Sequence, residues 1–176
     1  PTGNDNKGND RTAVCCLSSL NLETYDEWKD ESQFIEDVMR FLDNVMSDFI
    51  NKAPDTFKDA KYSAMRERSV GLGVMGLHSF FQQKGIPFGS VMSKVWNQKI
   101  FKHIHEKANE ASVKLAEERG PCPDAEEYGI KERFSNKTAI APTASISVIC
   151  GGASPGIEPI AANSYTHKTL SGSFNV

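Results

Sequence analysis

Two long stretches of the chain place apolar residues at helical spacing. Within residues 31–53, apolar side chains recur every three or four positions, which is the period of one face of an α-helix. Pro54 follows directly and ends the pattern. Residues 90–118 show the same spacing, and Gly120 lies just beyond them, where helices commonly stop. The pattern therefore predicts two long amphipathic helices.

Shorter apolar runs indicate strands. Residues 12–22 (TAVCCLSSLNL) form a run of small and apolar side chains that suits a buried strand followed by a bend. Residues 138–176 carry few charges and many Ser, Thr, Gly and Pro residues, with isoleucines interleaved as expected core positions. We expect the buried, loop-bearing end of a sheet here. Within it, residues 139–141 are predicted as a strand, 142–145 as a turn, and 146–148 as the start of the next element.

Residues 71–76 read GLGVMG, which matches the Gly-x-Gly-x-x-Gly fingerprint of dinucleotide-binding folds. That fingerprint follows a buried strand and opens a helix. Leu77 and Phe80 predict the helix, but the charges in residues 62–70 (YSAMRERSV) argue against a buried strand. The expected acidic residue about 20 positions further on is also missing, since residues 92–97 read MSKVWN. We interpret the glycines as a tight architectural turn, and a nicotinamide-dependent oxidoreductase stays as an alternative.

Composition and charge narrow the function classes only a little. With 39% hydrophobic and 24% charged residues, the 176-residue chain is typical of a globular protein with one sizeable core. The net charge of -3 and the absence of a long basic run give no footprint for nucleic acid. No apolar stretch approaches the roughly 18 residues of a membrane span. We expect a cytoplasmic protein with no membrane partner and no direct nucleic-acid partner.

The cysteines and histidines do not suggest a metal site. The chain has four cysteines: Cys15, Cys16, Cys122 and Cys150. Their spacing contains no C-x-x-C pair, so we expect neither a zinc site nor a disulfide scaffold. His103 and His105 lie two positions apart on a predicted helix, so they cannot face one ligand together, and we interpret both as solvated.

The predicted turn at residues 142–145 is a candidate anion site. Its successive backbone N–H groups, together with the hydroxyls of Thr143 and Ser145, can hold a phosphate, particularly if the turn opens a helix. A capping turn uses the same residue types, and this alternative stays open.

Three segments, in this order, resemble the catalytic barrel of the large subunit of class I ribonucleotide reductase. They are AVCCLSSLNL at 13–22, RERSVGLGVMGLHSFF at 66–81, and AIAPTASISVICGGASPGIEP at 139–159 with SYTHKTLSGSF at 164–174. The resemblance implies an α/β fold, namely part of a ten-stranded α/β barrel that is helix-rich with short strands. Residues 1–176 are then a single fragment of that barrel domain, which agrees with a chain that starts at Pro1 and ends on a strand-like sequence. In this family GLGVMG resembles a glycine-rich turn before a barrel helix.

The chemistry implied by the resemblance is reduction of ribonucleoside diphosphates to deoxyribonucleotides. In this family a thiyl radical starts the reaction, and a pair of cysteines supplies the reducing equivalents as it becomes a disulfide. Cys15 holds the place of one member of that pair. Cys16 follows directly and points to the opposite face of a strand, so it is not assigned the role.

The resemblance also implies where substrate phosphates bind. The matching residues are Pro142, Thr143, Ala144, Ser145 and Ile146. Some relatives carry a carboxylate at the position of Ala144, so the contacts here are expected to come mainly from the main chain. Glu158 lies in a stretch that matches the family near the site, and we expect it to pair with a backbone group or an arginine.

Cofactors and partners follow from the same resemblance. This segment is expected to bind no cofactor, because the radical comes from a metal-containing small subunit, and thioredoxin or glutaredoxin restores the cysteine pair. The other expected partners are the remainder of the large subunit and the ribonucleoside diphosphate. The radical cysteine and the second cysteine of the pair are not matched in this chain, so we expect no activity from it alone. A piece of a split reductase that acts only by assembly, and an adenosylcobalamin-dependent enzyme, stay as alternatives.

Overall fold

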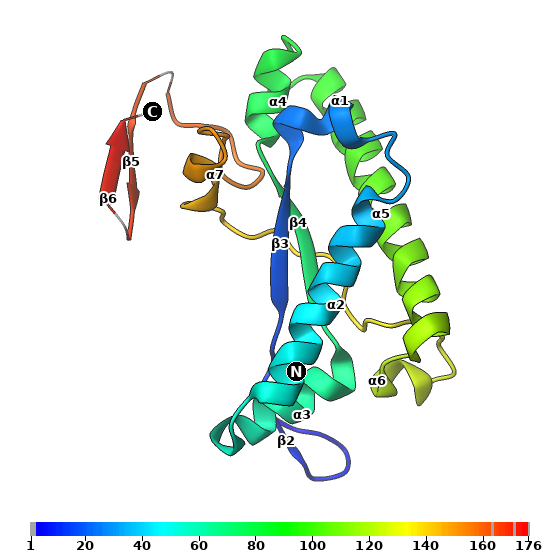
Figure 1. Ribbon diagram of the computed structural model, residues 1–176. Helices are drawn as coiled ribbons and strands as arrows, with labels where there is room; N and C mark the ends of the chain where they lie inside the picture. The colour runs from blue at the N-terminus through cyan, green and yellow to red at the C-terminus, as the bar shows by residue number, and fades with distance from the viewer. Residues whose placement is uncertain (1–2, 163, 171, 176) are drawn as a thin grey trace. The chain divides into compact units, whose positions relative to one another are not determined.

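The computed structural model describes residues 3–162, 164–170 and 172–175 (Figure 1). The chain folds into two compact units. The first consists of Pro1–Ser18, Gln33–Leu72 and Ile104–Ala139, and the second of Ser19–Ser32, Gly73–His103 and Ile140–Val176. Strands β3 and β4 and helix α5 run from one unit into the other.

Helices account for more of the described residues than strands do. The α-helices are α1 (Tyr25–Trp28), α2 (Phe34–Lys52), α3 (Lys58–Glu67), α4 (Leu77–Gln83), α5 (Val91–Arg119), α6 (Pro123–Glu126) and α7 (Ile146–Ile149), and the 3-10 helices are η1 (Leu22–Thr24) and η2 (Asp55–Phe57). The strands are β1 (Gly3–Asn4), β2 (Asp10–Arg11), β3 (Cys16–Asn21), β4 (Val70–Met75), β5 (Thr166–Thr169) and β6 (Gly172–Asn175). They pair as β1 with β2, β3 with β4, and β5 with β6. A helix-rich α/β fold with short strands is thereby confirmed.

The two long helices lie where the hydrophobic spacing predicts them. Helix α2 buries one stripe, made of Ile35, Met39, Leu42 and Met46. It ends where Ala53 turns to an extended conformation before Pro54, which supplies no N–H to continue a helix. Helix α5 differs from its predicted bounds by one residue at each end, and Gly120 follows it with a φ of 84°. This left-handed conformation costs glycine little and ends the helix.

Strand β4 corrects the interpretation of GLGVMG as a turn. Residues 70–75 form a strand in which every residue is buried, so the glycines at 71 and 73 lie inside a strand. Successive side chains of a strand point to opposite faces, which puts Val70, Leu72 and Val74 on one face and the glycines on the other. The chain then passes through Gly76, at a φ of 79°, directly into α4. No glycine-rich loop separates this strand from the helix, so the fingerprint lacks its phosphate-binding part.

The C-terminal segment differs from the prediction in two ways. Residues 139–141 do not form a strand, and pairing is limited to one parallel bridge between Thr138 and Leu72. The expected core isoleucines Ile140, Ile146, Ile149 and Ile157 are exposed, Ile149 to 82%. The predicted turn and the helix that begins at residue 146 are present. Strand β6 covers Gly172–Asn175, while Ser171 and Val176 lie outside the described residues.

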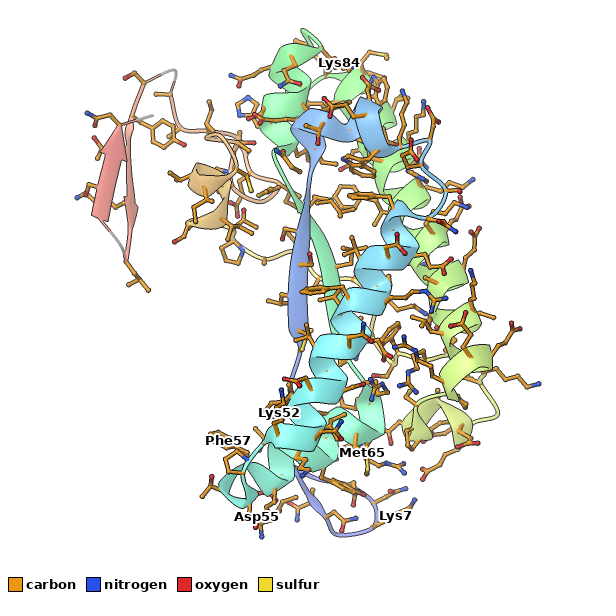
Figure 2. The ribbon with its side chains drawn as sticks, in the orientation of Figure 1. Lys7, Lys52, Asp55, Phe57, Met65 and Lys84 are labelled. Atoms are coloured by element: carbon orange, nitrogen blue, oxygen red, sulfur yellow. The ribbon has the colours of Figure 1, made fainter. Side chains whose placement is uncertain are left out.

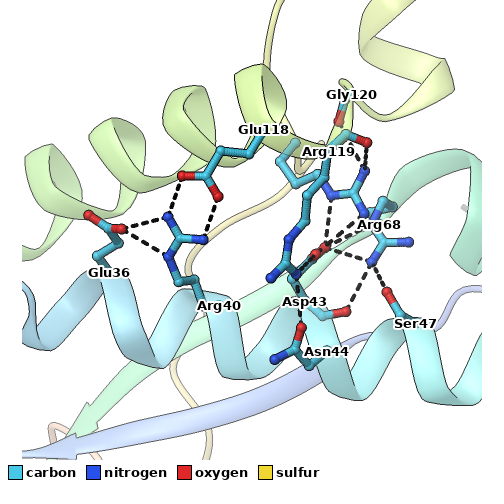
Figure 3. Close-up of polar contacts among 10 residues, drawn as sticks. Glu36, Arg40, Asp43, Asn44, Ser47, Arg68, Glu118, Arg119 and Gly120 are labelled. Atoms are coloured by element: carbon cyan, nitrogen blue, oxygen red, sulfur yellow. Dashed lines mark hydrogen bonds and ion pairs between the residues drawn. The ribbon is translucent and has the colours of Figure 1, made fainter.

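Ionic contacts join α2 to the end of α5 within the first unit (Figure 3). Two guanidinium nitrogens of Arg40 on α2 each contact a carboxylate oxygen of Glu118 at 2.6 Å. Arg40 also contacts Glu36, one turn earlier, at 2.7 Å.

Not every large side chain of this unit is covered, since Phe57 and Met65 are exposed around α3 (Figure 2). Among the helices of the described ranges, none is both long and apolar enough to cross a membrane.

Candidate redox and phosphate-binding sites

Cys15 lies immediately before β3, on the side of the strand that carries Leu17. Both side chains approach Gly71 of the neighbouring strand β4. A Cβ atom placed on Gly71 would stand 2.5 Å from Leu17 Cδ2, 2.9 Å from Ala139 Cβ and 3.2 Å from Cys15 Sγ. Three side chains therefore converge over the bare backbone of this glycine. Cys15 as a residue stays exposed.

The surroundings of Cys15 alter its acidity. Partial burial of the sulfur raises the pKa of the Cys15 thiol above its ordinary value. A hydrogen bond from the Ser69 hydroxyl opposes this rise in pKa, and the negative charge of Glu67 adds to it. The thiol is thus protonated at neutral pH, and both a proton and an electron can leave it when it is oxidised.

Cys16 occupies a different environment. It is half-buried, and burial raises the pKa of its thiol, while the positive charge of Arg68 acts in the opposite direction. For Cys15, the groups that act on the pKa beside burial are Ser69 and Glu67. The two adjacent cysteines therefore face different groups, as alternation along a strand requires. All four cysteines are free thiols, with Cys122 buried and Cys150 exposed.

The candidate phosphate turn contains a residue in an unusual conformation. Thr143 has a φ of 54°, a left-handed value that is rare for a β-branched side chain. Its hydroxyl is buried and accepts a hydrogen bond from the Gly156 N–H at 2.7 Å, and its carbonyl accepts one from the Ser147 N–H at 3.0 Å. The Thr143 side chain thus joins the turn to the loop that carries Gly156.

The rest of the turn offers main-chain donors. Pro142 and Ser145 are exposed and Ala144 is half-buried. In the described part of the chain, the N–H groups of Ala144, Ser145 and Ile146 have no backbone partner. Ile146 is the first residue of α7, Ser145 is its N-cap and Ala144 precedes the cap, so the helix itself supplies no acceptor for these N–H groups. Successive free N–H groups of this kind form a small concavity that suits an anion.

The loop after α7 is attached to the start of α4 within the second unit. Ser79 and Ser154 exchange two hydrogen bonds, each from the backbone N–H of one to the hydroxyl of the other, at 3.1 and 2.9 Å. The Gly76 N–H donates to the Ser154 carbonyl at 2.7 Å, and the Ile160 N–H donates to His78 Nδ1 at 2.7 Å. Sequence reasoning missed these contacts, since an isolated serine or histidine at a helix start carries no signal of its partner. Glu158 is exposed.

Of the two histidines of α5 that were predicted to be solvated, His103 differs from the prediction and His105 agrees with it. His103 is half-buried, and its Nδ1 lies 3.3 Å from the Tyr25 hydroxyl. Its ring also stacks on Trp28, with the centroids 6.3 Å apart. His105 is exposed and contacts Asn109. In the described ranges no three His, Cys, Asp or Glu side chains come together in a way that could hold a metal ion.

Comparisons with known proteins extend over most of the chain. The family model described as "Ribonucleotide reductase, barrel domain" matches residues 4–132 and 123–176. A ribonucleoside-diphosphate reductase large subunit of Invertebrate iridescent virus 6 is 52% identical over 93% of this chain and 17% of its own length. A vitamin B12-dependent ribonucleoside-diphosphate reductase of Thermoplasma acidophilum is 36% identical over 90% of this chain and 21% of its own length.

A solved structure shows the same similarity in three dimensions. The class Id ribonucleotide reductase alpha subunit of Actinobacillus ureae matches with a TM-score of 0.82 and 42% identity. The match covers 87% of this chain and 29% of that subunit. This chain therefore spans less than a third of the length of these proteins.

Proposed function

Because the chain belongs to the ribonucleotide reductase barrel-domain family, we propose that it forms part of the large subunit of a ribonucleoside-diphosphate reductase. The observation that carries this proposal is the continuous similarity to such subunits across both Cys15 and the turn at residues 142–146. The family model also extends over both compact units, which supports residues 1–176 as one stretch of a single barrel domain.

We assign Cys15 as one thiol of the redox pair. In the reaction, two thiols lose two electrons and two protons and become a disulfide, while the ribonucleotide loses its 2′-oxygen as water and becomes a deoxyribonucleotide. A second cysteine outside this chain, and a thiyl radical generated elsewhere, complete the chemistry. The exposure of Cys15 as a residue supports this role, because a disulfide partner must come close to it.

We assign the substrate phosphates to the turn formed by Pro142, Thr143, Ala144, Ser145 and Ile146. The free N–H groups of Ala144, Ser145 and Ile146 are suitable donors to a diphosphate. The buried hydroxyl of Thr143 already accepts a hydrogen bond from Gly156, so its main part in binding is to hold the turn in shape.

Partners are proposed by the same reasoning. They are the remainder of the large subunit, the ribonucleoside diphosphate, a metal-containing small subunit that supplies the radical, and thioredoxin or glutaredoxin as the dithiol reductant. The name of the Thermoplasma relative supports vitamin B12 as a second candidate radical source. Addition of a small subunit or of adenosylcobalamin to the complete subunit distinguishes the two candidate radical sources.

Four free thiols suit the reducing cytoplasm, which we propose as the location.

The redox role is tested with Cys15→Ser in the complete enzyme, with a small dithiol as the reductant. We expect turnover to be abolished while substrate binding is retained, because serine keeps the shape and cannot form a disulfide. The matched control is Cys16→Ser, which we expect to keep most of the activity. Turnover near the original rate in Cys15→Ser overturns the assignment.

The phosphate role is tested with two substitutions at one position. Ser145→Pro removes a main-chain N–H, whereas Ser145→Ala removes only the hydroxyl. We expect the substrate KM to rise in Ser145→Pro by more than in Ser145→Ala. An unchanged KM in both variants places the phosphates elsewhere.

A further inference from the structure

Two residues at the start of β4 face Cys15. Ser69 directly precedes the strand and Gly71 is its second residue, so alternation puts both on one side of the strand. Ser69 is 7% exposed although it is polar. Its hydroxyl therefore projects from the side of β4 that faces Cys15, and it acts to lower the pKa of the Cys15 thiol.

Gly71 leaves the space that the thiol occupies. Of the atoms that a Cβ on Gly71 would meet, Leu17 Cδ2 is the end of a flexible side chain and can move aside. Ala139 Cβ cannot move in this way, because it is attached directly to a backbone whose N–H donates to the Leu72 carbonyl at 3.2 Å. A methyl group at residue 71 therefore displaces the strand, or the Cys15 sulfur that lies 3.2 Å away.

Ser69 acts on the charge state of the same sulfur. Burial removes water from the sulfur and so disfavours the charged thiolate, whereas a donated hydrogen bond favours it. The Ser69 hydroxyl therefore offsets part of the effect of burial on the pKa. Ser69 and Gly71 project from the same side of the strand, and a Cβ atom on Gly71 would lie 3.2 Å from the Cys15 sulfur, so the sulfur lies on that side.

We propose that Ser69 and Gly71 are positioning residues for Cys15, with Ser69 orienting the thiol by a hydrogen bond and Gly71 leaving the room in which it sits. The inference rests on the redox role proposed for Cys15. A disulfide forms only when both sulfur atoms meet within a narrow range of distance and dihedral angle. A thiol held between a glycine and a serine is placed in advance for that step.

The test measures the reactivity of Cys15 across pH in the full chain. Iodoacetamide alkylation is followed by mass spectrometry in a Cys16→Ser background, with the exposed Cys150 as the internal reference. Loss of one hydrogen bond in Ser69→Ala is expected to slow alkylation of Cys15 by about threefold to fivefold at near-neutral pH, with Cys150 unchanged. Ser69→Thr, which keeps the hydroxyl, should restore the profile. An unchanged Cys15 profile in Ser69→Ala overturns the role of Ser69.

Gly71→Ala is compared with Gly89→Ala, since a Cβ at Gly89 meets nothing within 4 Å. We expect the first substitution to change the alkylation rate of Cys15 and the second to leave it unchanged. Equal rates in the two variants overturn the role of Gly71. Circular dichroism confirms that each variant is folded before its rate is measured.

Turnover of the complete enzyme separates this inference from the proposed function. If Ser69→Ala lowers kcat without changing KM and also shifts the alkylation profile, both stand. If the profile shifts but Cys15→Ser retains turnover, Ser69 positions a thiol that the reaction does not use, and the proposed redox role fails alone. If Cys15→Ser is inactive and Ser69→Ala is unchanged in both assays, the positioning role fails alone.

Discussion

The carboxylate of Asp43 on α2 is 0% exposed and lies among three guanidinium groups. Arg68 approaches it with two nitrogens at 2.9 and 2.6 Å, Arg133 with Nε at 2.9 Å, and Arg119 with Nη1 at 2.7 Å. Figure 3 shows Arg68 reaching it from the end of α3 and Arg119 from the end of α5. Burial alone raises the pKa of the Asp43 carboxyl, but contacts with the three arginines outweigh it and the pKa is lowered. The charged form of this one side chain therefore holds several segments together.

Asp43→Asn tests this arrangement with little change in shape. The amide carries no charge and offers its own N–H donors to guanidinium groups, which can only donate. Removal of one partner from a buried ion pair typically costs about 3–5 kcal/mol, because the remaining charges stay buried without compensation. For a chain of this size that loss lowers Tm by about 6–20 °C. Native proteins have only about 5–15 kcal/mol of stability, so the variant is close to unfolding.

The matched control is Asp48→Asn on the same helix. Asp48 is 59% exposed and pairs with Lys52 one turn later, so its loss should change the free energy of unfolding by no more than about 0.5 kcal/mol. Both variants are compared by urea unfolding followed by circular dichroism, and by calorimetry. If Asp43→Asn costs no more than the control, the buried charge does not stabilise the fold and the reasoning is refuted.

Three further predictions follow from single features of the chain. The stability supplied by Asp43 is present above the ordinary aspartate pKa of about 3.9 and is lost as pH falls through its lowered folded value, so urea midpoints measured across acid pH should fall less steeply in Asp43→Asn. Gly76→Ala combines a φ of 79° with a Cβ that would lie 2.8 Å from Asn21 Oδ1, so calorimetry should show a loss of about 1–3 kcal/mol, against little change in Gly89→Ala. Phe80→Ala empties a fully buried site and should cost about 3–5 kcal/mol in urea unfolding.

The long helices could be predicted from the sequence because their signal is local. A period of 3.6 residues repeated over α2 and α5 leaves few alternatives, and Pro54 and Gly120 mark the ends. Strand β4 could not be predicted in the same way, since its glycines imitate a turn. Gly71 is there because Cys15 and its neighbours need the space, and that requirement comes from residues more than 50 positions away in the sequence.

The C-terminal segment could not be predicted for the same reason, namely that its structure depends on residues far away in the sequence. The sequence indicates isoleucines such as Ile149 as core residues, but it does not show what covers them, and in the described residues Ile149 is exposed. The small polar residues Thr143 and Ser154 are buried instead. Their hydrogen-bond partners, Gly156 and Ser79, lie in other segments, so the sequence around each residue does not reveal its burial. For the candidate sites, Cys15 and the turn followed from motif resemblance, whereas the Gly156 contact to Thr143 required the structure.

Arg68 lies in sequence directly before Ser69, the residue proposed to position Cys15. It caps α3 in a left-handed conformation with a φ of 45°, which is strained for an arginine, and its guanidinium is held by Asp43. Ser69 is the next residue, and its hydroxyl acts to lower the pKa of the Cys15 thiol. The contacts of Arg68 with Asp43 therefore stabilise a strained backbone position directly before Ser69. Loss of the Asp43 charge should then alter the alkylation profile of Cys15 as well as stability, in a variant whose change lies far from the sulfur in sequence.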